Sequence, residues 1–263
     1  MQLAARSGLK SLMLLGCLLL SLPLAAEQVV RVGAVHFPPY VDKPEQGREP
    51  GLLDELLAAL NALQDDYRFI SVPTSLPRRY RDFSAGRIDL AFFENPRWDW
   101  QDTPHVAVDM GLEDCEVFVA RADAGRGQDY FDDLQGKRLA LFSGYHYAFA
   151  GFDATPRHLS ERFHATLTYS HDSNLRMVLR GRADIAPVTR SYLELYYRRH
   201  PEVAAQLLVS QRVDQVYRHQ ALLRPQAPLE ASRLAALLEA LRERGTLAAI
   251  FMPYHIRVPG PGE

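Results

Sequence analysis

The sequence predicts an α/β fold made of two successive units, each built around a parallel sheet. Strand-like apolar runs alternate with leucine stripes at helical spacing, which is typical of α/β proteins. The same alternation begins again after residue 120, which indicates a second unit. The chain has 263 residues, 47% hydrophobic and 24% charged, which is an ordinary soluble composition and a suitable length for two small lobes.

The first 26 residues have the pattern of a secretory signal peptide. Arg6 and Lys10 precede an apolar run over residues 12–24, and two alanines end the segment. The run is short for a membrane span, which needs roughly 20 apolar residues. We therefore expect cleavage after Ala26 and a mature chain in the periplasm.

A lipid anchor is the alternative for this leader. Leu14-Leu15-Gly16-Cys17 resembles a lipoprotein box, in which Cys17 would be acylated. The apolar run continues past Cys17, where a lipoprotein normally turns polar, so simple cleavage is favoured. Removal of the leader leaves Cys115, which cannot form an intramolecular disulfide. The alternation around Cys115 predicts a buried strand cysteine.

The first unit reads strand, helix, strand, helix, strand. Two prolines at positions 38 and 39 end the first strand, because proline cannot continue a strand ladder. Leucines spaced by three, one, three and three residues predict one helix. The expected elements are strands at 29–35, 67–72 and 88–93 and a leucine-rich helix at 53–63.

The second unit repeats this order. We expect strands at 138–142, 167–169 and 184–188, and a helix over residues 175–179 that stops at Gly181. A last helix carries leucines at 234, 237, 238 and 241. Arginines in its last turn and Gly245 after it are typical helix-end signals.

The loops at the carboxyl ends of these strands are the expected ligand site, because open α/β sheets bind ligands there. One such loop, residues 94–100, holds both tryptophans of the protein and Arg97, and aromatic faces with one guanidinium suit a small acid or a stacked ring. The alternative is that both tryptophans fill a hydrophobic gap. The predicted contacts from these loops are Phe37, Tyr40, Glu94, Asn95, Arg97, Trp98, Trp100, Ser143, Gly144 and Tyr145.

The turn at Ser143-Gly144 leaves two interpretations open. Small residues before a helix free backbone N–H groups and favour an anion. A plain turn explains the same residues equally well.

The search for catalytic and metal motifs finds none. The sequence has no Gly-x-Ser-x-Gly elbow, no phosphate loop and no His-x-x-x-His spacing, so we expect no metal and no cofactor. With 30 Lys and Arg against 32 Asp and Glu, the formal charge of −2 gives no reason to expect a nucleic-acid partner.

Six short segments in a fixed order give the sequence a family resemblance. The mature chain resembles bacterial extracellular solute-binding protein family 3, the periplasmic binders of ABC importers for polar amino acids, over most of residues 28–255. The segments are Val29–Val35 running into Phe37-Pro38-Pro39-Tyr40; Gly51 with Asp54; Gly86-Arg87-Ile88-Asp89-Leu90; Asp133-Leu134-Gln135-Gly136-Lys137-Arg138-Leu139-Ala140; Gly181-Arg182-Ala183-Asp184; and the helix ending at Gly245, followed by Ile250 and Tyr254.

The resemblance implies a two-lobed, type II periplasmic-binding fold with a hinge. Each lobe would be a mixed, mainly parallel sheet flanked by helices. Residues 27–120 plus 221–263 would form lobe 1, and residues 121–220 would form lobe 2. A small solute would bind in the cleft while the lobes close. The partners would be an ABC permease or a membrane sensor, and we expect a monomer.

Two departures from the family pattern bear on the ligand. The family's carboxylate-binding arginine follows the third strand, where Arg97 is the nearest match in a shorter loop. The family's ammonium-binding aspartate falls at Thr189, with Arg190 next, and these two residues complete the predicted contacts. A neutral residue cannot supply the counter-charge that a buried ammonium needs. We therefore expect an anionic or aromatic solute without an ammonium group.

Three functions remain under consideration. The first is a non-catalytic solute-binding protein serving an importer or a sensor. The second is a periplasmic dehydratase similar to cyclohexadienyl dehydratase, with Glu94 or Asp99 as the acid that protonates a leaving hydroxyl. The third is an interaction module that signals to a membrane receptor.

Overall fold

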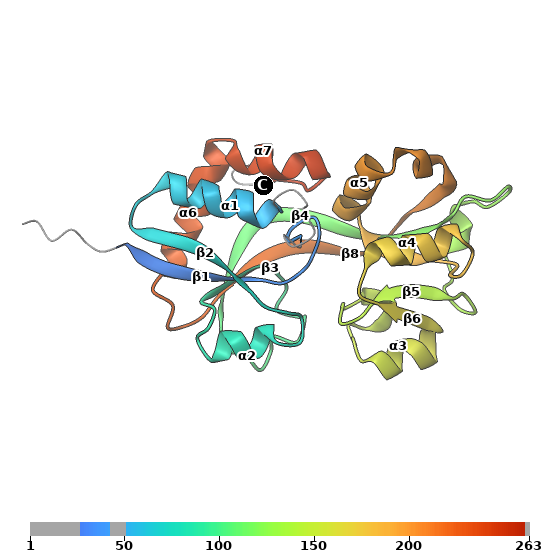
Figure 1. Cartoon of the computed structure of the whole chain (residues 1–263), viewed down its shortest axis with the longest axis horizontal. Coiled ribbons are helices and arrows are strands. Elements are labelled where there is room, and N and C mark those ends of the chain that lie inside the picture. Colours follow the sequence, from blue (N-terminus) through green and yellow to red (C-terminus); the bar gives the residue numbers. More distant parts are fainter. Residues whose placement is uncertain (1–26, 43–50, 261–263) are drawn as a thin grey trace, which may run out of the picture.

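The computed structural model describes residues 27–42 and 51–260 and has two lobes joined by two long strands (Figure 1). The predicted leader and Cys17 lie outside the described residues. The first lobe contains β1 (Gln28–Ala34), α1 (Leu52–Leu63), β2 (Tyr67–Pro73), α2 (Arg79–Ser84), β3 (Leu90–Glu94), α6 (Ala231–Glu243), α7 (Thr246–Phe251) and η5 (Met252–Tyr254).

The second lobe lies at the other end of the long strands. Its elements are η2 (Gln128–Phe131), β5 (Leu139–Phe142), η3 (Ala148–Ala150), α3 (Pro156–Phe163), β6 (Ala165–Thr168), α4 (His171–Leu179), β7 (Ala186–Thr189), α5 (Arg190–Arg199) and η4 (Pro201–Gln206). The strands and helices expected from the sequence are present. For most of these elements, the observed ends differ from the expected ends by one to three residues.

The start of α1 shows how local sequence fixes the first lobe. Gly51 packs against the backbone of the preceding loop: a Cβ there would lie 2.8 Å from the Tyr40 carbonyl oxygen, so only glycine fits. The Asp54 carboxylate accepts a hydrogen bond from the Gly51 N–H at 3.1 Å and satisfies a donor at the helix start. The apolar stripe of α1 then packs into the core between α1, the sheet and the C-terminal helices.

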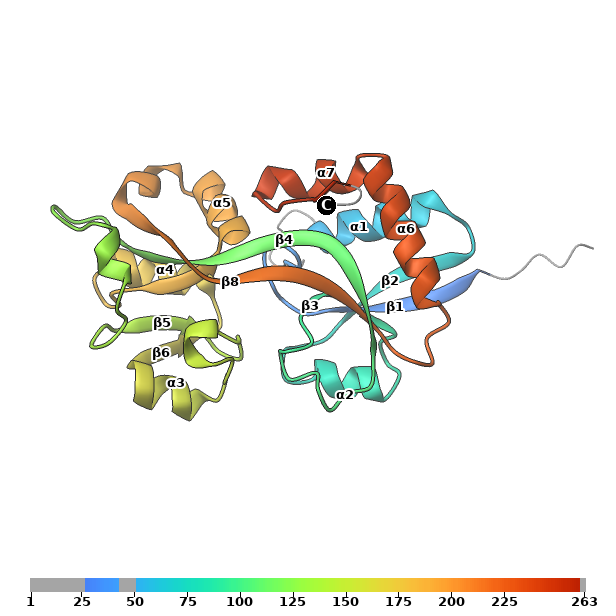
Figure 2. The same ribbon diagram turned by 180° about the vertical axis from the view of Figure 1, so that it is seen from behind.

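Two long antiparallel strands connect the lobes. β4 (Val106–Arg121) and β8 (Leu207–Leu223) pair along most of their length and cross from one lobe to the other (Figure 2). Their register shifts between residues 109 and 113 and again near residues 116–119. The pairing is therefore least regular near the crossing. The sequence analysis recognised only a part of β4 around Cys115.

The lobes share these strands but have sheets of different composition. In the first lobe the order is β2-β1-β3-β8-β4, parallel among β1, β2 and β3 and antiparallel at β3–β8. In the second lobe, β7 joins β4 antiparallel, and β5 pairs parallel with β6. A bridge between Leu139 and Ile185 links β5 to the segment before β7. The six-stranded sheet, which includes β7, is mixed, and the two-stranded β5–β6 sheet is parallel. The predicted two-lobed α/β fold class is confirmed by the comparisons below.

Two further expectations can be compared with the fold. Cys115 lies on a strand as predicted but is half-buried rather than buried, and its sulfur accepts a 3.4 Å hydrogen bond from Arg190 Nε. It sits on β4 near the crossing, where less of the lobes covers the strand. Within residues 27–42 and 51–260, no helix has the length and apolarity that crossing a membrane requires.

Candidate ligand-binding cleft

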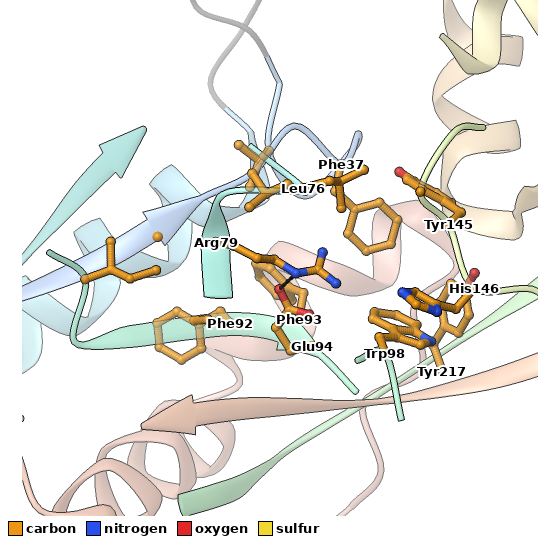
Figure 3. A pocket seen from close by; sticks show the side chains of 16 residues that line it. Phe37, Leu76, Arg79, Phe92, Phe93, Glu94, Trp98, Tyr145, His146 and Tyr217 are labelled. Carbon is orange, nitrogen blue, oxygen red and sulfur yellow. Dashed lines mark ion pairs between the residues drawn. The ribbon is translucent and has the colours of Figure 1, made fainter. Parts of the chain in front are cut away.

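A pocket of about 50 Å³ lies where the two lobes face each other (Figure 3). The first lobe supplies most of its wall, the turn before η3 supplies the other side, and Tyr217 on β8 closes the hinge side. Its lining side chains include Phe37, Leu76, Arg79, Phe92, Glu94, Trp98, Tyr145, His146 and Tyr217. We call this the inner pocket.

A larger hollow of about 1050 Å³ adjoins the inner pocket and shares Val35, Leu76, Gly144 and His146 with it. Residues of both lobes line this outer hollow, including Arg97 from the first and Phe152 from the second. The Arg97 guanidinium lies 4.0 Å from the centre of the Phe152 ring, so a cation–π contact spans the cleft at this point. The inner pocket and the outer hollow together form an interlobe cleft.

A buried ion pair forms one wall of the inner pocket. Arg79, the first residue of α2, and Glu94, the last residue of β3, approach to 3.5 Å between Nε and Oε1. Both side chains are more than nine-tenths buried. Glu94 Oε2 accepts a 2.9 Å hydrogen bond from Trp100 Nε1, while Arg79 Nη2 donates to the Tyr80 hydroxyl at 2.7 Å. Burial raises the pKa of Glu94, and Arg79 opposes that rise.

Three buried polar atoms of the inner pocket have no hydrogen-bond partner. They are Arg79 Nε, Trp98 Nε1 and the Tyr145 hydroxyl, and all three residues are less than 10% exposed. Such atoms are rare in folded proteins, because each costs about 1–3 kcal/mol. Two of the three are N–H donors from the first lobe, and the third is a hydroxyl from the second lobe. Their pairing by a ligand held between the lobes would remove this cost.

The second lobe contributes the turn around His146, which several polar contacts hold in place. The His146 Nδ1 atom lies 2.9 Å from the Phe152 carbonyl oxygen, and its Nε2 lies 3.6 Å from the Asp99 carboxylate. Burial lowers the pKa of His146, which favours the neutral imidazole. At the following η3, the Asp214 carboxylate accepts hydrogen bonds from the backbone N–H groups of Ala148 and Phe149 at 2.7 and 2.9 Å.

Buried acids on β4 lie close to the cleft. Glu116 accepts a 3.0 Å hydrogen bond from Gln215 Nε2, which also donates to the His146 carbonyl at 2.7 Å. Burial raises the pKa of Glu116 to about 8, with repulsion from Asp214 adding to it. Its carboxyl group is therefore mainly protonated at neutral pH.

A second buried network ties both lobes to the crossing strands. Asp114 on β4 accepts hydrogen bonds from the Tyr40 hydroxyl at 2.8 Å and from the Ser191 hydroxyl at 2.5 Å. His219 Nε2 on β8 lies 2.8 Å from the same Tyr40 oxygen. Desolvation raises the pKa of Asp114 to about 6 and lowers that of His219 to about 3. Tyr40 therefore belongs to the hinge region.

The predicted contacts divide into two groups by position. One group lines the inner pocket or the outer hollow: Phe37, Glu94, Arg97, Trp98, Ser143, Gly144 and Tyr145. The other group lines neither of these two cavities as the described residues form them: Tyr40, Asn95, Trp100, Thr189 and Arg190. Whether any of them touches a ligand stays a prediction.

The second group has structural contacts that explain its positions. Trp100 is fully buried against Tyr80 and Phe83 and supports Glu94. The hydroxyl of Thr189 accepts a hydrogen bond from the Tyr192 N–H at 3.1 Å and caps α5. The alternative interpretation of the tryptophan loop, that it fills a gap, thus describes Trp100, whereas Trp98 lines the pocket.

The sequence analysis missed Arg79, Leu76 and Tyr217. Arg79 lies in the run Arg78-Arg79-Tyr80-Arg81, which reads as the charged face of a short helix. The only feature of the sequence that could have indicated Arg79 as a site residue is that this helix follows the carboxyl end of a predicted strand. Tyr217 lies on β8, a strand that the sequence analysis did not recognise.

Comparison with known proteins decides the family. The model for "ABC transporter, phosphonate, periplasmic substrate-binding protein" matches residues 106–251, more than half of the chain. The chain belongs to this family. It is therefore a substrate-binding protein of the ABC transporter type, in a family of periplasmic proteins, as the resemblance implied.

Solved structures of a sensor domain and of an ABC transporter binding protein share the fold. A histidine kinase sensor domain with similarity to periplasmic binding proteins has a TM-score of 0.65 at 18% identity, covering 89% of this chain and 99% of its own. A probable amino-acid ABC transporter extracellular-binding protein from Bacillus subtilis has a TM-score of 0.65 at 15% identity, covering 87% and 98%.

A third structure bears on the enzyme alternative. It is an ancestral amino acid-binding protein described as a precursor of cyclohexadienyl dehydratase, with a TM-score of 0.62 at 16% identity, covering 86% of this chain and 94% of its own. Identities this low establish the two-lobed fold and nothing about the ligand. No curated protein matches this chain.

Proposed function

We propose that this substrate-binding protein captures a small solute, an organic acid or amino-acid-like molecule, between its lobes. The single observation behind this proposal is the inner pocket, where three buried polar atoms from both lobes make no hydrogen bond. A solute that paired with Arg79, Trp98 and Tyr145 would relieve their desolvation cost only when both lobes contact it. Binding would therefore favour the closed arrangement.

We assign the moving bodies to the lobes expected from the sequence: residues 27–120 plus 221–263, and residues 121–220. The register shifts of β4 and β8 near residues 109–119 support a hinge at the crossing. Phe37, Glu94, Trp98, Gly144 and Tyr145 are the proposed contacts in the inner pocket, with Arg97 and Ser143 at its entrance.

The proposed setting is the bacterial periplasm, reached by cleavage of the leader after Ala26. The solute-loaded monomer would then dock on an ABC permease or on a membrane sensor. A pull-down from membranes with and without the solute separates these partners, because only the partner that recognises the closed form is enriched by the solute.

The test of solute capture is the thermal unfolding midpoint in the presence of a library of organic acids, amino acids and small peptides. A ligand that binds only the native state raises the midpoint, by about 2.7 kcal/mol of stabilisation at 100 times its Kd. We expect a raised midpoint with at least one acid. No shift across the library would contradict solute capture.

A dehydratase is the second candidate, because Glu94 is an acid in the pocket wall. Burial raises its pKa, which favours a proton-donating form. Two contacts oppose this role, since Glu94 faces Arg79 and accepts from Trp100. Assays of prephenate and arogenate decide the matter: product formation that Glu94→Gln abolishes would support the enzyme, and tight binding without product would exclude it.

A further inference from the structure

The charged groups around the inner pocket restrict the chemistry of its ligand. The ionisable side chains among the described lining residues are Arg79, Glu94, His146 and two tyrosines. Burial lowers the pKa of His146 and raises those of Tyr145 and Tyr217, so these three side chains are neutral near pH 7. The electrostatics of the pocket are set by Arg79 and Glu94.

The unpartnered groups of the first lobe are donors. Trp98 Nε1 carries an N–H without an acceptor. The Arg79 guanidinium carries the positive charge of this wall, and its Nε lies 3.5 Å from Glu94 Oε1 without a hydrogen bond. Both oxygens of Glu94 thus face Arg79 or Trp100. A guanidinium and an indole N–H donor that line the same pocket match a carboxylate. A ligand cation would meet no free acceptor of negative charge on this wall.

The second lobe has no free carboxylate for an ammonium at the inner pocket. Thr189, at the position where the resemblance places an aspartate, uses its hydroxyl to cap α5 and to bond Ser191. Asp114 is held by Tyr40 and Ser191. Asp99 faces the outer hollow and its side chain is 68% exposed, so pairing there would contribute little.

Glu116 is a buried acid close to this site. One of its oxygens has no partner, but Glu116 does not line the inner pocket as the described residues form it. A buried ammonium left without a counter-charge is strongly disfavoured. The pocket therefore discriminates against amino acids.

The remaining walls are apolar and aromatic. Phe37, Leu76, Phe92 and Tyr217 surround the space beside Arg79 (Figure 3). The unpartnered hydroxyl of Tyr145 faces this space from the second lobe and can either donate or accept. It suits a hydroxyl or carbonyl oxygen next to a carboxylate.

We infer that the ligand is a monoanionic 2-hydroxy or 2-oxo acid with an apolar side chain and no ammonium group. Its carboxylate would lie on Arg79 and Trp98, its 2-oxygen on Tyr145 and its side chain among the aromatic rings. This inference rests on the proposed function and narrows it. A phosphonate dianion fits less well, because Glu94 already offsets the one buried guanidinium.

Calorimetry with matched probes tests the inference on the purified protein. Phenyllactate and 4-methyl-2-oxopentanoate are compared with phenylalanine and leucine, which have the same side chains and an ammonium group, and with benzylphosphonate. We expect each acid to bind at least about tenfold more tightly than its amino acid, and more tightly than the phosphonate. An amino acid or the phosphonate binding as tightly as the acid would overturn the inference.

The Trp98→Phe variant tests the proposed geometry. It keeps an aromatic ring but removes an N–H that has no partner in the protein together with part of the buried indole volume. Its unfolding midpoint is therefore measured alongside its Kd, to show that the variant is folded. We expect its Kd for phenyllactate to rise about tenfold, as for the loss of one hydrogen bond to a charged group. Tyr130→Phe, a matched hydroxyl deletion outside the cleft, should leave this Kd unchanged.

The remaining outcomes separate this inference from the proposed function. An unchanged Kd in Trp98→Phe would overturn the assignment of the carboxylate. If none of the five probes binds while another solute of the library shifts the unfolding midpoint, the inference is wrong and the proposed function stands. If nothing in the library binds, both are wrong.

Discussion

Single residues in this protein owe their roles to burial that the sequence does not reveal. Trp98 and Trp100 are two positions apart, yet Trp98 lines the pocket and Trp100 supports Glu94. Asp99 between them has a φ of 57°, so the loop does not follow a simple alternation. The sequence predicted this loop as part of the site but could not tell which tryptophan faces the cleft.

Arg79 illustrates the same limit. Its neighbours Arg78 and Arg81 have the same chemistry, but only Arg79 is buried, because it packs beside Glu94 and the Tyr80 and Trp100 rings. Such a choice among neighbouring arginines depends on tertiary packing. The predicted Arg97 instead lies at the outer hollow, on Phe152.

Glu116 should make the stability of the protein depend on pH. Its folded-state pKa of about 8 exceeds the ordinary value of 4.5, so the folded state binds the proton more tightly than the unfolded state. This contribution to the free energy of unfolding is present below pH 4.5 and is lost as the pH rises through 8. Glu116→Gln mimics the protonated acid. The decrease in the free energy of unfolding between low pH and pH 9 should therefore be smaller in this variant than in the wild type, by on the order of 2 kcal/mol.

Urea unfolding at pH 5 and pH 9, followed by tryptophan fluorescence, measures this effect. The surface substitution Glu161→Gln serves as the control and should leave the pH dependence unchanged. Identical pH dependence in the wild type and Glu116→Gln would show that Glu116 does not hold its proton in the folded state.

At the scale of elements, both lobes contain the same aspartate–arginine ion pair next to a strand. In each lobe a Gly-Arg-x-Asp segment places an aspartate against an arginine of a neighbouring strand. Asp89 pairs with Arg31 within β1, and Asp184 pairs with Arg138 just before β5. Each aspartate also accepts a hydrogen bond from the backbone N–H of that arginine. The segments Gly86–Leu90 and Gly181–Asp184, quoted for the family resemblance, thus fix strand neighbours in both lobes.

The Asp89 and Asp184 ion pairs should contribute unequally to the free energy of unfolding. Asp89 is fully buried and also binds Arg224 at 2.7 Å, whereas the side chains of Asp184 and Arg138 are 26% and 55% exposed. Asp89→Asn should therefore lower the free energy of unfolding by about 3 kcal/mol, and Asp184→Asn by about 1 kcal/mol or less. Urea titrations of both variants at pH 7 measure the difference. Equal losses would contradict the role assigned to burial.

The elements themselves were largely predictable, and the long strands were not. Leucine spacing located α1 and α6, because a buried helix face repeats every three to four residues. β4 and β8 change their surroundings along their length as they leave one lobe and enter the other, and their register shifts. No single alternation pattern therefore runs through them.

For the whole molecule, the central claim is that a solute binds between two lobes that must separate to admit it. Leu76 and Gly144 face each other across the cleft: a Cβ built on Gly144 would lie 3.9 Å from the Leu76 Cβ. Disulfides span roughly 3.5–4.5 Å between Cβ atoms, so the Leu76→Cys/Gly144→Cys variant should crosslink the lobes on oxidation. Gly144 has a φ of 86°, so a cysteine there adds strain of about 1–2 kcal/mol to both redox forms.

The decisive measurement is the solute-induced shift of the unfolding midpoint in this variant, with the solute added before or after oxidation. The solute is the one that gives the largest shift in the wild type, and the two single-cysteine variants control for Cys115. We predict a shift in the reduced form and none when the solute is added to the oxidised, locked form. Equal shifts in the reduced and the locked protein would place the solute outside the cleft and contradict the account.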